Sequence, residues 1–374
     1  MPSILKTMSA ATFHNFGALS HGLLTRCVRF AAAVARHHAT LATGWWLALA
    51  GWDLHPLGFI SSFQLFDTAS RMTRLSLAHP KFALGIIVVS GTLAVMIPPG
   101  LILIIYGILT EESVGKLLIA GIFPGILTAL GYILTIMYVV WKNPDWVPAA
   151  KSFDKQAAVN SLRPVWPVFL LIGVVVFALY GGVATPSEIG ALGAFSALAI
   201  VLCLKRMDRK KLLDSLASTV KTTSMIIAIV TGAMIFGYFL TFSQATDSLI
   251  SYVDSLGLSP WQVMMLVVLM YLILGLFMDQ LAILVLTVPT TYALISTFGF
   301  DGVWFGIVIT KTVEIGLVTP PLGLNVFVAS GVTGVKSSEC FKGVVPFLIV
   351  DLVVLGLIVA FPALVLWVPN MSGW

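Results

Sequence analysis

Two segments of this 374-residue chain share an unusual centre: SGTLAVMIPPGLILIIYGIL at residues 90–109 and EIGLVTPPLGLNVFVASGV at residues 314–332. Each places two consecutive prolines inside a long apolar stretch. Proline lacks a backbone N–H and disfavours helix in the residue before it, so we expect both helices to unwind there. Unpaired backbone groups are tolerated at membrane depth only where they are buried in protein or line a cavity. The two segments therefore predict a membrane protein with two broken helices.

Composition also indicates a membrane protein. Hydrophobic residues make up 59% of the chain and charged residues only 10%, whereas soluble domains carry about 25% charged residues. A helix needs roughly 20 apolar residues to cross the hydrocarbon core of a bilayer. The runs of about this length that carry no charge are residues 82–110, 117–141, 165–187, 189–204, 222–246, 256–278, 280–300 and 315–335. With a final run at 343–374 that contains one charge, they predict an all-α fold, a polytopic transmembrane helical bundle.

The basic residues predict the orientation of this bundle. They cluster in short connections between apolar runs, where the positive-inside rule puts them, so the net charge of +5 needs no nucleic acid to explain it. The residues of two adjacent connections are Lys142, Lys151, Lys155 and Arg163, followed by Lys205, Arg206, Arg209, Lys210 and Lys211. We expect both connections, and Lys336 and Lys342, to be cytoplasmic. Residues 110–116, 243–260 and the C-terminus are then periplasmic.

The chain carries no signal for enzyme or metal chemistry. Cys27, Cys203 and Cys340 are far apart, without the spacing of a zinc site or a disulfide framework. Neither a nucleophile elbow nor a phosphate-binding loop is present, and histidine is absent from residues 80–374. We therefore expect neither catalysis nor a resident cofactor.

The first 80 residues differ from the rest. All six histidines fall there, and the only acidic residues are Asp53 and Asp67. A weakly apolar stretch at residues 39–66 is interpreted as a poor or interfacial membrane segment. This break in composition divides the chain into a divergent N-terminal region, residues 1–80, and a transmembrane domain, residues 81–369.

The two double prolines predict an internal repeat in opposite orientations. Glycines flank both breaks, with Gly91 and Gly100 in the first and Gly316 and Gly323 in the second. By the loop charges, the two halves lie opposed in the membrane. Broken helices at matching positions of two halves indicate the binding site of a transporter. The alternative is that the prolines merely kink two structural helices.

Polar residues inside the apolar runs are further candidates. Asp279 and Gln280 lie between two short apolar runs in GLFMDQLAILVLTVP, residues 275–289, the pattern of a re-entrant hairpin with a polar tip. A loop at the membrane interface is the alternative. Lys311 and Glu314 lie three residues apart on one helix face, which favours a structural pair.

Two further acids have simpler interpretations. Glu188 follows Thr185 and Ser187 at an expected helix start, which favours a cap. Asp351 is interpreted as a buried hydrogen-bonding partner, with an ion or proton site as the alternative.

Four stretches, taken in order, resemble one family. They are SGTLAVMIPPGLILIIYGILTEESVGKLLIAGIFPG, YGGVATPSEIGALGAF, GLFMDQLAILVLTVP and EIGLVTPPLGLNVFVASGV. Together they resemble the large permease subunit of TRAP (tripartite ATP-independent periplasmic) transporters, of the C4-dicarboxylate type, over about residues 81–369.

This resemblance implies an elevator-type transporter with two helical hairpins in inverted repeats. It implies sodium as the coupling ion and a C4-dicarboxylate or related carboxylate as the substrate. The implied partners are a periplasmic solute-binding protein, a small four-helix membrane subunit and the lipid bilayer. The implied location is the bacterial inner membrane, as a multi-pass protein.

The resemblance also implies where the site lies. The second hairpin matches residues 275–289, and the two broken helices match residues 91–100 and 316–325. Carbonyl and hydroxyl oxygens hold sodium in such sites, which makes Thr319 and Thr92 the expected sodium ligands, with Ser90 beside them. The candidate substrate- and ion-binding residues are Ser90, Gly91, Thr92, Pro98, Pro99, Asp279, Gly316, Thr319, Pro320, Pro321, Gly323 and Asn325.

The N-terminal region departs from this family. Its first hairpin should lie before His79, yet those residues do not resemble it. We hypothesise a truncated, shifted or misassigned reading frame, which sequencing of the locus would test. Two alternatives to transport by a TRAP system follow: a membrane remnant without a complete site, or an anion permease of another hairpin-containing family.

Overall fold

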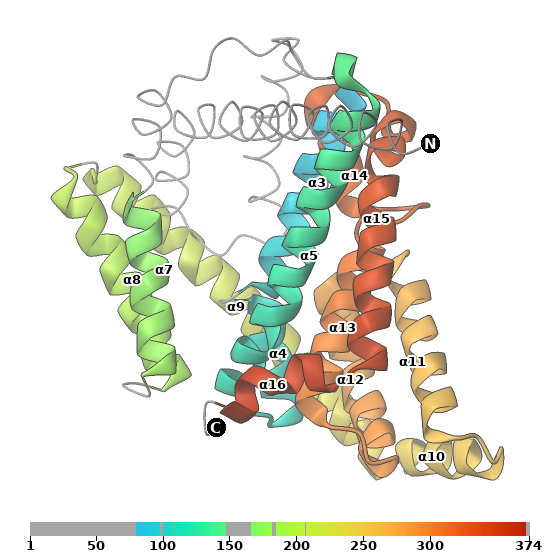
Figure 1. Ribbon diagram of the computed structural model, residues 1–374. Coiled ribbons are helices and arrows are strands. Elements are labelled where there is room, and N and C mark those ends of the chain that lie inside the picture. Colours follow the sequence, from blue (N-terminus) through green and yellow to red (C-terminus); the bar gives the residue numbers. More distant parts are fainter. Residues whose placement is uncertain (1–79, 98–99, 147–165, 182–184, 206, 372–374) are drawn as a thin grey trace, which may run out of the picture.

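The computed structural model describes residues 80–97, 100–146, 166–181, 185–205 and 207–371 (Figure 1). Within these ranges the regular structure is entirely helical. The elements are α3 (Pro80–Met96), α4 (Leu101–Thr110), α5 (Val114–Lys142), the 3₁₀ helix η1 (Pro144–Trp146), α7 (Trp166–Tyr180), α8 (Pro186–Cys203), α9 (Arg209–Phe242), α10 (Ala245–Ser255), α11 (Pro260–Gly275), α12 (Gln280–Thr297), α13 (Gly302–Gly316), α14 (Leu324–Thr333), α15 (Ser337–Ala360) and α16 (Ala363–Met371). Of the described helices, α5, α9, α12 and α15 are each long and apolar enough to cross a membrane. The all-α transmembrane fold is confirmed.

Both predicted helix breaks are present. In the first segment α3 ends at Met96 and α4 begins at Leu101; in the second, α13 ends at Gly316 and α14 begins at Leu324. Pro98 and Pro99 themselves lie outside the described residues, as does the whole N-terminal region to residue 79. The predicted membrane segment at residues 39–66 therefore also lies outside them.

Two predicted spans have the wrong bounds. The run expected to start at residue 315 belongs to a helix that starts at Gly302, because Lys311 and Glu314 are buried inside that helix and do not end it. The final run, expected as one span, is divided into α15 and α16 at Phe361 and Pro362. Proline there has no N–H to continue the helix of α15.

The two broken helices run antiparallel. The start of α3 lies beside the start of α15, which directly follows α14, and Gly85 and Gly343 pack backbone against backbone there. At the other end, the Tyr106 hydroxyl of α4 donates to the Gly302 carbonyl oxygen at the start of α13, at 2.7 Å. In Figure 1 the chain runs downward from α3 to α4 and upward from α13 to α14. The predicted inverted arrangement of the two halves is confirmed.

Helices α11 and α12 form the predicted hairpin. The ring of Trp261, at the start of α11, lies 5.3 Å from the ring of Phe300, just after α12, measured between centroids. Both ends of the hairpin therefore lie on the same side of the bundle. Its tip, residues 276–279, lies between Gly275 and the N-cap of α12.

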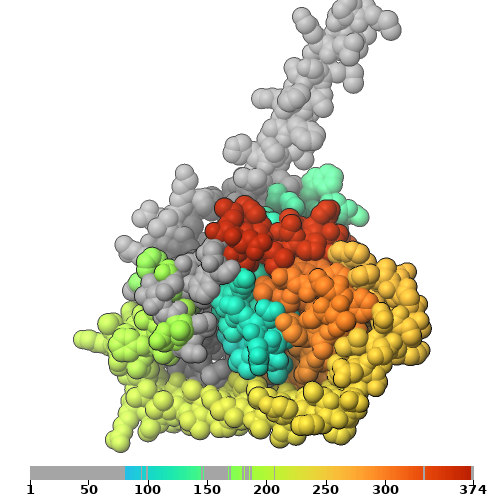
Figure 2. Space-filling model, turned by 90° about the horizontal axis from the view of Figure 1, so that it is seen from below, coloured from blue at the N-terminus to red at the C-terminus, as the bar shows by residue number. Residues whose placement is uncertain are grey.

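The bundle has a dense centre and a thinly packed outer part. Helix α13 occupies the centre and contacts α3, α4, α5, α11, α12 and α15. Seen from below in Figure 2, the red α16 lies along one side of the bundle and borders the teal and orange segments, and it contacts α5 and α13. In contrast, only Thr222 and Ala233 of α9 are buried by the described chain. The candidate site belongs to the dense part.

Candidate functional site

The first break begins with residues that differ in exposure. Thr92 is 1% exposed and donates its hydroxyl hydrogen to the Val89 carbonyl oxygen at 2.8 Å. Ser90 is exposed and donates to the Ile86 carbonyl oxygen at 2.6 Å, while Gly91 is half-buried. Thr92 therefore points into the bundle, and Ser90 lies on its surface.

The second break leaves a row of carbonyl oxygens free. Leu317, Val318 and Thr319 still donate their N–H groups to the last turn of α13. Within the described backbone, the carbonyl oxygens of residues 318–322 accept no hydrogen bond. Such groups in an unwound membrane helix are the usual oxygen ligands of a coupling cation.

The side chains of the second break lie around these carbonyls. Thr319 is half-buried and donates to the Ile315 carbonyl oxygen at 2.6 Å, which leaves its hydroxyl lone pairs available. Pro320 and Pro321 are exposed. Asn325 is 8% exposed, and its backbone N–H reaches back to the Leu317 carbonyl oxygen at 3.3 Å. This last bond closes the break into a compact loop.

Gly323 is required by the geometry of this loop. Its φ is +45° and its ψ is 65°, in the left-handed region that favours glycine. A Cβ added there would lie 2.7 Å from the ring of Phe341. The residue thus permits both the turn and the close packing of α15 against it.

The hairpin tip lies directly against the second break. A Cβ added to Gly316 would lie 2.5 Å from the Cα of Gly275, so the end of α11 and the end of α13 touch through their backbones. Asp279 is exposed and accepts a hydrogen bond from the Leu281 N–H at 3.0 Å, which caps α12. Gln280 beside it is 7% exposed, and its Oε1 atom has no hydrogen-bond partner. The structure thereby brings Asp279 and Gly316 into one region, and it adds Gln280 as a polar group aimed into the protein.

A buried ionic cluster lies at the centre of the bundle. The Lys311 ammonium contacts the Asp351 Oδ1 atom at 2.7 Å and the Glu314 Oε2 atom at 3.1 Å. The Tyr132 hydroxyl lies 2.7 and 2.8 Å from the two Asp351 carboxylate oxygens. All three charged side chains are at most 1% exposed. The predicted Lys311–Glu314 pair is confirmed, and Asp351 is the buried hydrogen-bonding partner that was expected.

Helix α3 brings Thr92 to the same part of the bundle. This helix packs against α13, which carries Glu314, and against α5, which carries Tyr132, and Thr92 is buried there. Sequence reasoning did not find Tyr132, because one tyrosine in an apolar run carries no signal of its own. The polar lining of the bundle therefore comes from α3, α5, α13 and α15 together.

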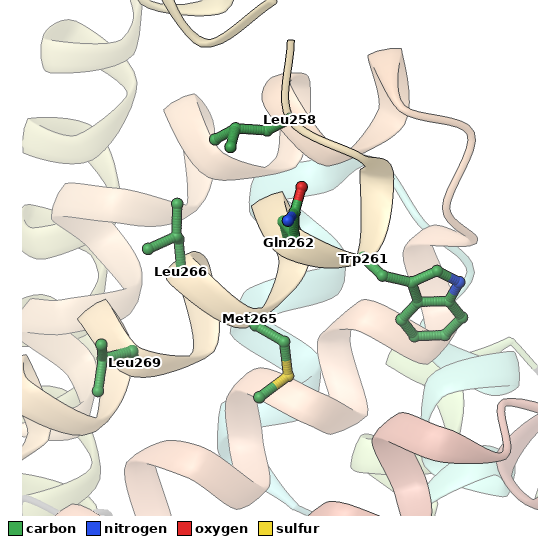
Figure 3. A pocket seen from close by; sticks show the side chains of 6 residues that line it. All are labelled: Leu258, Trp261, Gln262, Met265, Leu266 and Leu269. Atoms are coloured by element: carbon green, nitrogen blue, oxygen red, sulfur yellow. The ribbon is translucent and has the colours of Figure 1, made fainter. Parts of the chain in front are cut away.

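The other candidate features are structural. Glu188 forms a capping box with Thr185, whose N–H donates to the Glu188 carboxylate at 2.7 Å, so the predicted cap is confirmed. An open groove of about 580 Å³ follows the outer face of α11 and is lined by Leu258, Trp261, Gln262, Met265, Leu266 and Leu269 (Figure 3). The one polar side chain among these six, Gln262, accepts a hydrogen bond from the Ser259 N–H at 2.8 Å. The lining of the groove is therefore mostly apolar.

A comparison with known families matches residues 71–364 to the Tripartite ATP-independent periplasmic transporter, DctM component. The chain belongs to this family. The match covers both broken helices, the hairpin and the ionic cluster. It begins at residue 71, inside the N-terminal region.

Relatives in this family carry several substrate names. The C4-dicarboxylate TRAP transporter large permease protein DctM of Pseudomonas aeruginosa is 33% identical over 98% of this chain and 80% of its own length, so that alignment enters the N-terminal region. The sialic acid TRAP transporter large permease protein SiaM of Vibrio cholerae is 28% identical over 78% of this chain and 68% of its own. The isethionate TRAP transporter permease protein DctMQ of Oleidesulfovibrio alaskensis is 30% identical over 76% of this chain and 45% of its own. The chain is thus a TRAP large permease and a multi-pass membrane protein.

Proposed function

We propose that this chain is the large subunit of a sodium-coupled secondary transporter that imports an organic acid across the bacterial inner membrane. The observation that carries the proposal is the second break. The carbonyl oxygens of residues 318–322 accept no hydrogen bond within the described backbone, and they follow Gly316, which packs against Gly275 at the end of α11. Oxygen ligands from an unwound membrane helix are what a sodium ion requires.

The sodium ligands on this proposal are side-chain hydroxyls and backbone oxygens. Thr319 supplies a hydroxyl at the second break, and Thr92 supplies one four residues before α3 ends at Met96. On this proposal, further residues of the two broken helices and the hairpin tip complete the site. They are Ser90, Gly91, Pro98 and Pro99 in the first broken helix, Gly316, Pro320, Pro321, Gly323 and Asn325 in the second, and Asp279 at the hairpin tip.

An anionic substrate fits the same region. The N-terminus of α14 begins immediately after Gly323, and the positive end of a half-helix dipole attracts a carboxylate. Relatives are named for C4-dicarboxylates, sialic acid and isethionate, all of which are organic anions. We therefore assign the substrate to the organic acids, with a C4-dicarboxylate as the first to test.

The partners on this proposal are a periplasmic solute-binding protein and a small four-helix membrane subunit. The exposed apolar side chains of α9, which include Ile235, Phe239 and Phe242, support a covering partner or lipid along that helix. The relative from Oleidesulfovibrio alaskensis carries the joined name DctMQ and is matched over 45% of its length.

Uptake by reconstituted vesicles tests the proposal. The purified chain would be inserted into vesicles with its small subunit, and the binding protein would be added outside with radiolabelled dicarboxylate. We expect accumulation when a sodium gradient is imposed, and none when potassium replaces sodium or when the binding protein is left out. Uptake that persists in potassium would refute sodium coupling, and uptake without the binding protein would refute the three-part system.

The break in composition at about residue 80 favours a second candidate, a membrane remnant that keeps the fold without a complete site. A chimera would separate the two candidates by replacing residues 1–80 with the corresponding region of the Pseudomonas aeruginosa relative. Uptake by the chimera but not by the native chain would support the remnant. Equal uptake by both would eliminate it.

A further inference from the structure

The start of α9 carries a concentrated positive charge. Residues 205–221 include six basic residues and two acidic ones, a net charge of +4 in a chain whose whole net charge is +5. The positive-inside rule places this stretch on the cytoplasmic side of the membrane. The basic residues are Lys205, Arg206, Arg209, Lys210, Lys211 and Lys221, and the acidic ones are Asp208 and Asp214.

The charged part of α9 extends beyond the hydrocarbon of the bilayer. The helix has 34 residues, which at 1.5 Å per residue make about 51 Å, whereas the hydrocarbon core is about 30 Å thick. The uncharged run at residues 222–246 is by itself long enough to cross that core. In Figure 1, α9 runs obliquely from the side of α7 and α8 toward α10. Residues 209–221 therefore lie at the cytoplasmic surface of the membrane.

Residues 209–221 have one apolar face. Leu213, Leu216 and Val220 follow the helical spacing of three and four residues, so they share one side of the helix. They are 56%, 54% and 65% exposed, and the residues of α9 that the described chain buries, Thr222 and Ala233, both lie beyond this segment. The described protein thus leaves the apolar face of this segment open.

Lysines border this apolar face. At about 100° per residue, Lys210 and Lys221 lie about 90–110° around the helix from the centre of the face, and both are exposed. Arg209, also exposed, lies at the end of the face nearest the cytoplasm. This arrangement is typical of a helix in the membrane interface, where apolar side chains enter the acyl region and long basic side chains reach out to the phosphates.

The excess of positive charge indicates which lipids the segment binds. Clusters of basic residues next to a membrane span attract anionic headgroups, whereas a zwitterionic headgroup has no net charge to offer. Asp208 offsets little of this attraction, because its carboxylate caps α9 by accepting the Arg209 N–H at 2.7 Å. Asp214 lies away from the apolar face, on the polar side of the helix.

We propose that residues 209–221 are a binding surface for anionic phospholipids of the cytoplasmic leaflet. Leu213, Leu216 and Val220 enter the acyl region, and Arg209 and Lys210 bind the headgroup phosphates. This surface needs neither solute nor sodium, so it does not rest on the proposed transport function. The same helix packs against α12 of the hairpin further along its length, so bound lipid holds one end of a helix that supports the hairpin.

Native mass spectrometry of the purified full chain in detergent tests the proposal. Phosphatidylglycerol and phosphatidylcholine with the same acyl chains would be titrated, and the bound lipids counted. We expect tighter binding of phosphatidylglycerol, weakened on the order of 30-fold in the double variant Arg209→Gln, Lys210→Gln, at about five-fold for each basic residue. The matched control is Lys142→Gln, Lys336→Gln, which removes the same charge from two other exposed positions and should change the affinity by less than about two-fold.

Two further measurements separate a lipid surface from a site for phosphate alone. Leu213→Ser, Leu216→Ser keeps every charge and should also weaken phosphatidylglycerol binding, because the acyl chains lose their contacts. Glycerol phosphate, which has the headgroup charge without acyl chains, should not displace the lipid. All substituted positions are exposed, so the variants should fold, and circular dichroism would check this. Added salt should weaken binding to the native chain, which requires no variant.

Five results would overturn the proposal. Equal binding of the two lipids, or an unchanged affinity in Arg209→Gln, Lys210→Gln, would remove the anionic-lipid surface. An equal loss in the control variant would reduce it to the overall charge of the chain. Displacement by glycerol phosphate would assign the site to free phosphate. A change from dimer to monomer in the Leu213→Ser, Leu216→Ser variant, with lipid binding unchanged, would assign the face to a second copy of the chain.

Discussion

Helices α13 and α9 differ in how their amino-acid composition relates to their burial. Helix α13 carries Lys311, Glu314 and several threonines, yet its residues from Val303 to Gly316 are all buried. Helix α9 contains an apolar window of 18 residues with a mean hydropathy of 2.1, but only 6% of that window is buried by the described chain. In a bilayer, apolar side chains gain nothing by leaving lipid, whereas polar side chains need protein partners. Buried polar side chains therefore accompany the apolar core at the centre of this protein.

The same comparison explains where the free backbone groups lie. The second break follows α13 directly and is held by Gly275, Phe341 and the last turn of α13. A helix exposed to lipid, such as α9, could not leave carbonyl groups unpaired. The second break joins α13 to α14, two helices that both pack against α15, although Pro320, Pro321 and Leu322 themselves are exposed.

The largest expected effect on stability comes from replacing Lys311, the cation of the buried ionic cluster. Lys311→Met leaves Glu314 and Asp351 facing one another without a positive charge, and breaking a buried ion pair typically costs about 3–5 kcal/mol. Lys210→Met, at the exposed start of α9, should change stability by less than about 0.5 kcal/mol. Thermal unfolding of both variants in detergent checks this. Equal melting temperatures would mean that the cluster does not hold the centre together.

A smaller effect on stability is expected when one glycine in each of the same two helices is replaced by alanine. Gly316→Ala would force a methyl group to within 2.5 Å of the Gly275 Cα, and overpacking typically costs about 1–3 kcal/mol. Gly232→Ala in α9 meets nothing within 4 Å and improves helix propensity, so it should be neutral or stabilising by up to about 1 kcal/mol. Unfolding curves that move in the same direction for both variants would contradict the close approach of α11 and α13.

Thr319→Ala should weaken sodium activation and leave folding nearly intact. It removes one hydroxyl ligand while the backbone oxygens remain, a loss of about 1 kcal/mol by analogy with a hydrogen bond, or several-fold in apparent affinity. The sodium dependence of uptake, measured in a chain with a family-type first hairpin, checks this. Thr241→Ala in α9, whose hydroxyl donates to the Gly237 carbonyl oxygen at 3.0 Å, is the matched control. An unchanged sodium dependence in Thr319→Ala would return the double proline to a structural role.

The smallest effect is expected at the hairpin tip. Asp279→Asn keeps a side-chain oxygen for the Leu281 N–H, and asparagine caps helices as well as aspartate does, so stability should change by less than about 0.5 kcal/mol. Asp279→Cys should react with a membrane-impermeant thiol reagent in opened vesicles, because this position is exposed. Thr312→Cys, in the buried centre, should be protected. Protection of both cysteines would mean that the tip is a buried structural element.

The sequence predicted the features that depend on local chemistry. The double prolines predicted both breaks, GLFMDQLAILVLTVP predicted the hairpin, and Thr185 with Glu188 predicted a capped helix start. In each case, the signal lies within a few residues of the feature.

What the sequence did not predict depends on residues far apart in the chain. The contact between Tyr132 and Asp351 joins positions 219 residues apart, and nothing at either position identifies the other. The start of α13 was missed because charged residues were taken to end an apolar run, an argument that holds only when no distant partner neutralises them. The burial of Gln280, whose Oε1 atom has no hydrogen-bond partner in the described structure, likewise depends on the fold.

Sodium binding to the purified chain tests the central claim most directly, since it requires neither partner subunits nor transport. A ligand that binds only the folded state raises the melting temperature as its concentration increases. We expect sodium chloride to raise the melting temperature of the native chain above that in equal potassium chloride, with a smaller difference in Thr319→Ala. Identical melting temperatures in the two salts across the whole concentration range would contradict a sodium site at the second break.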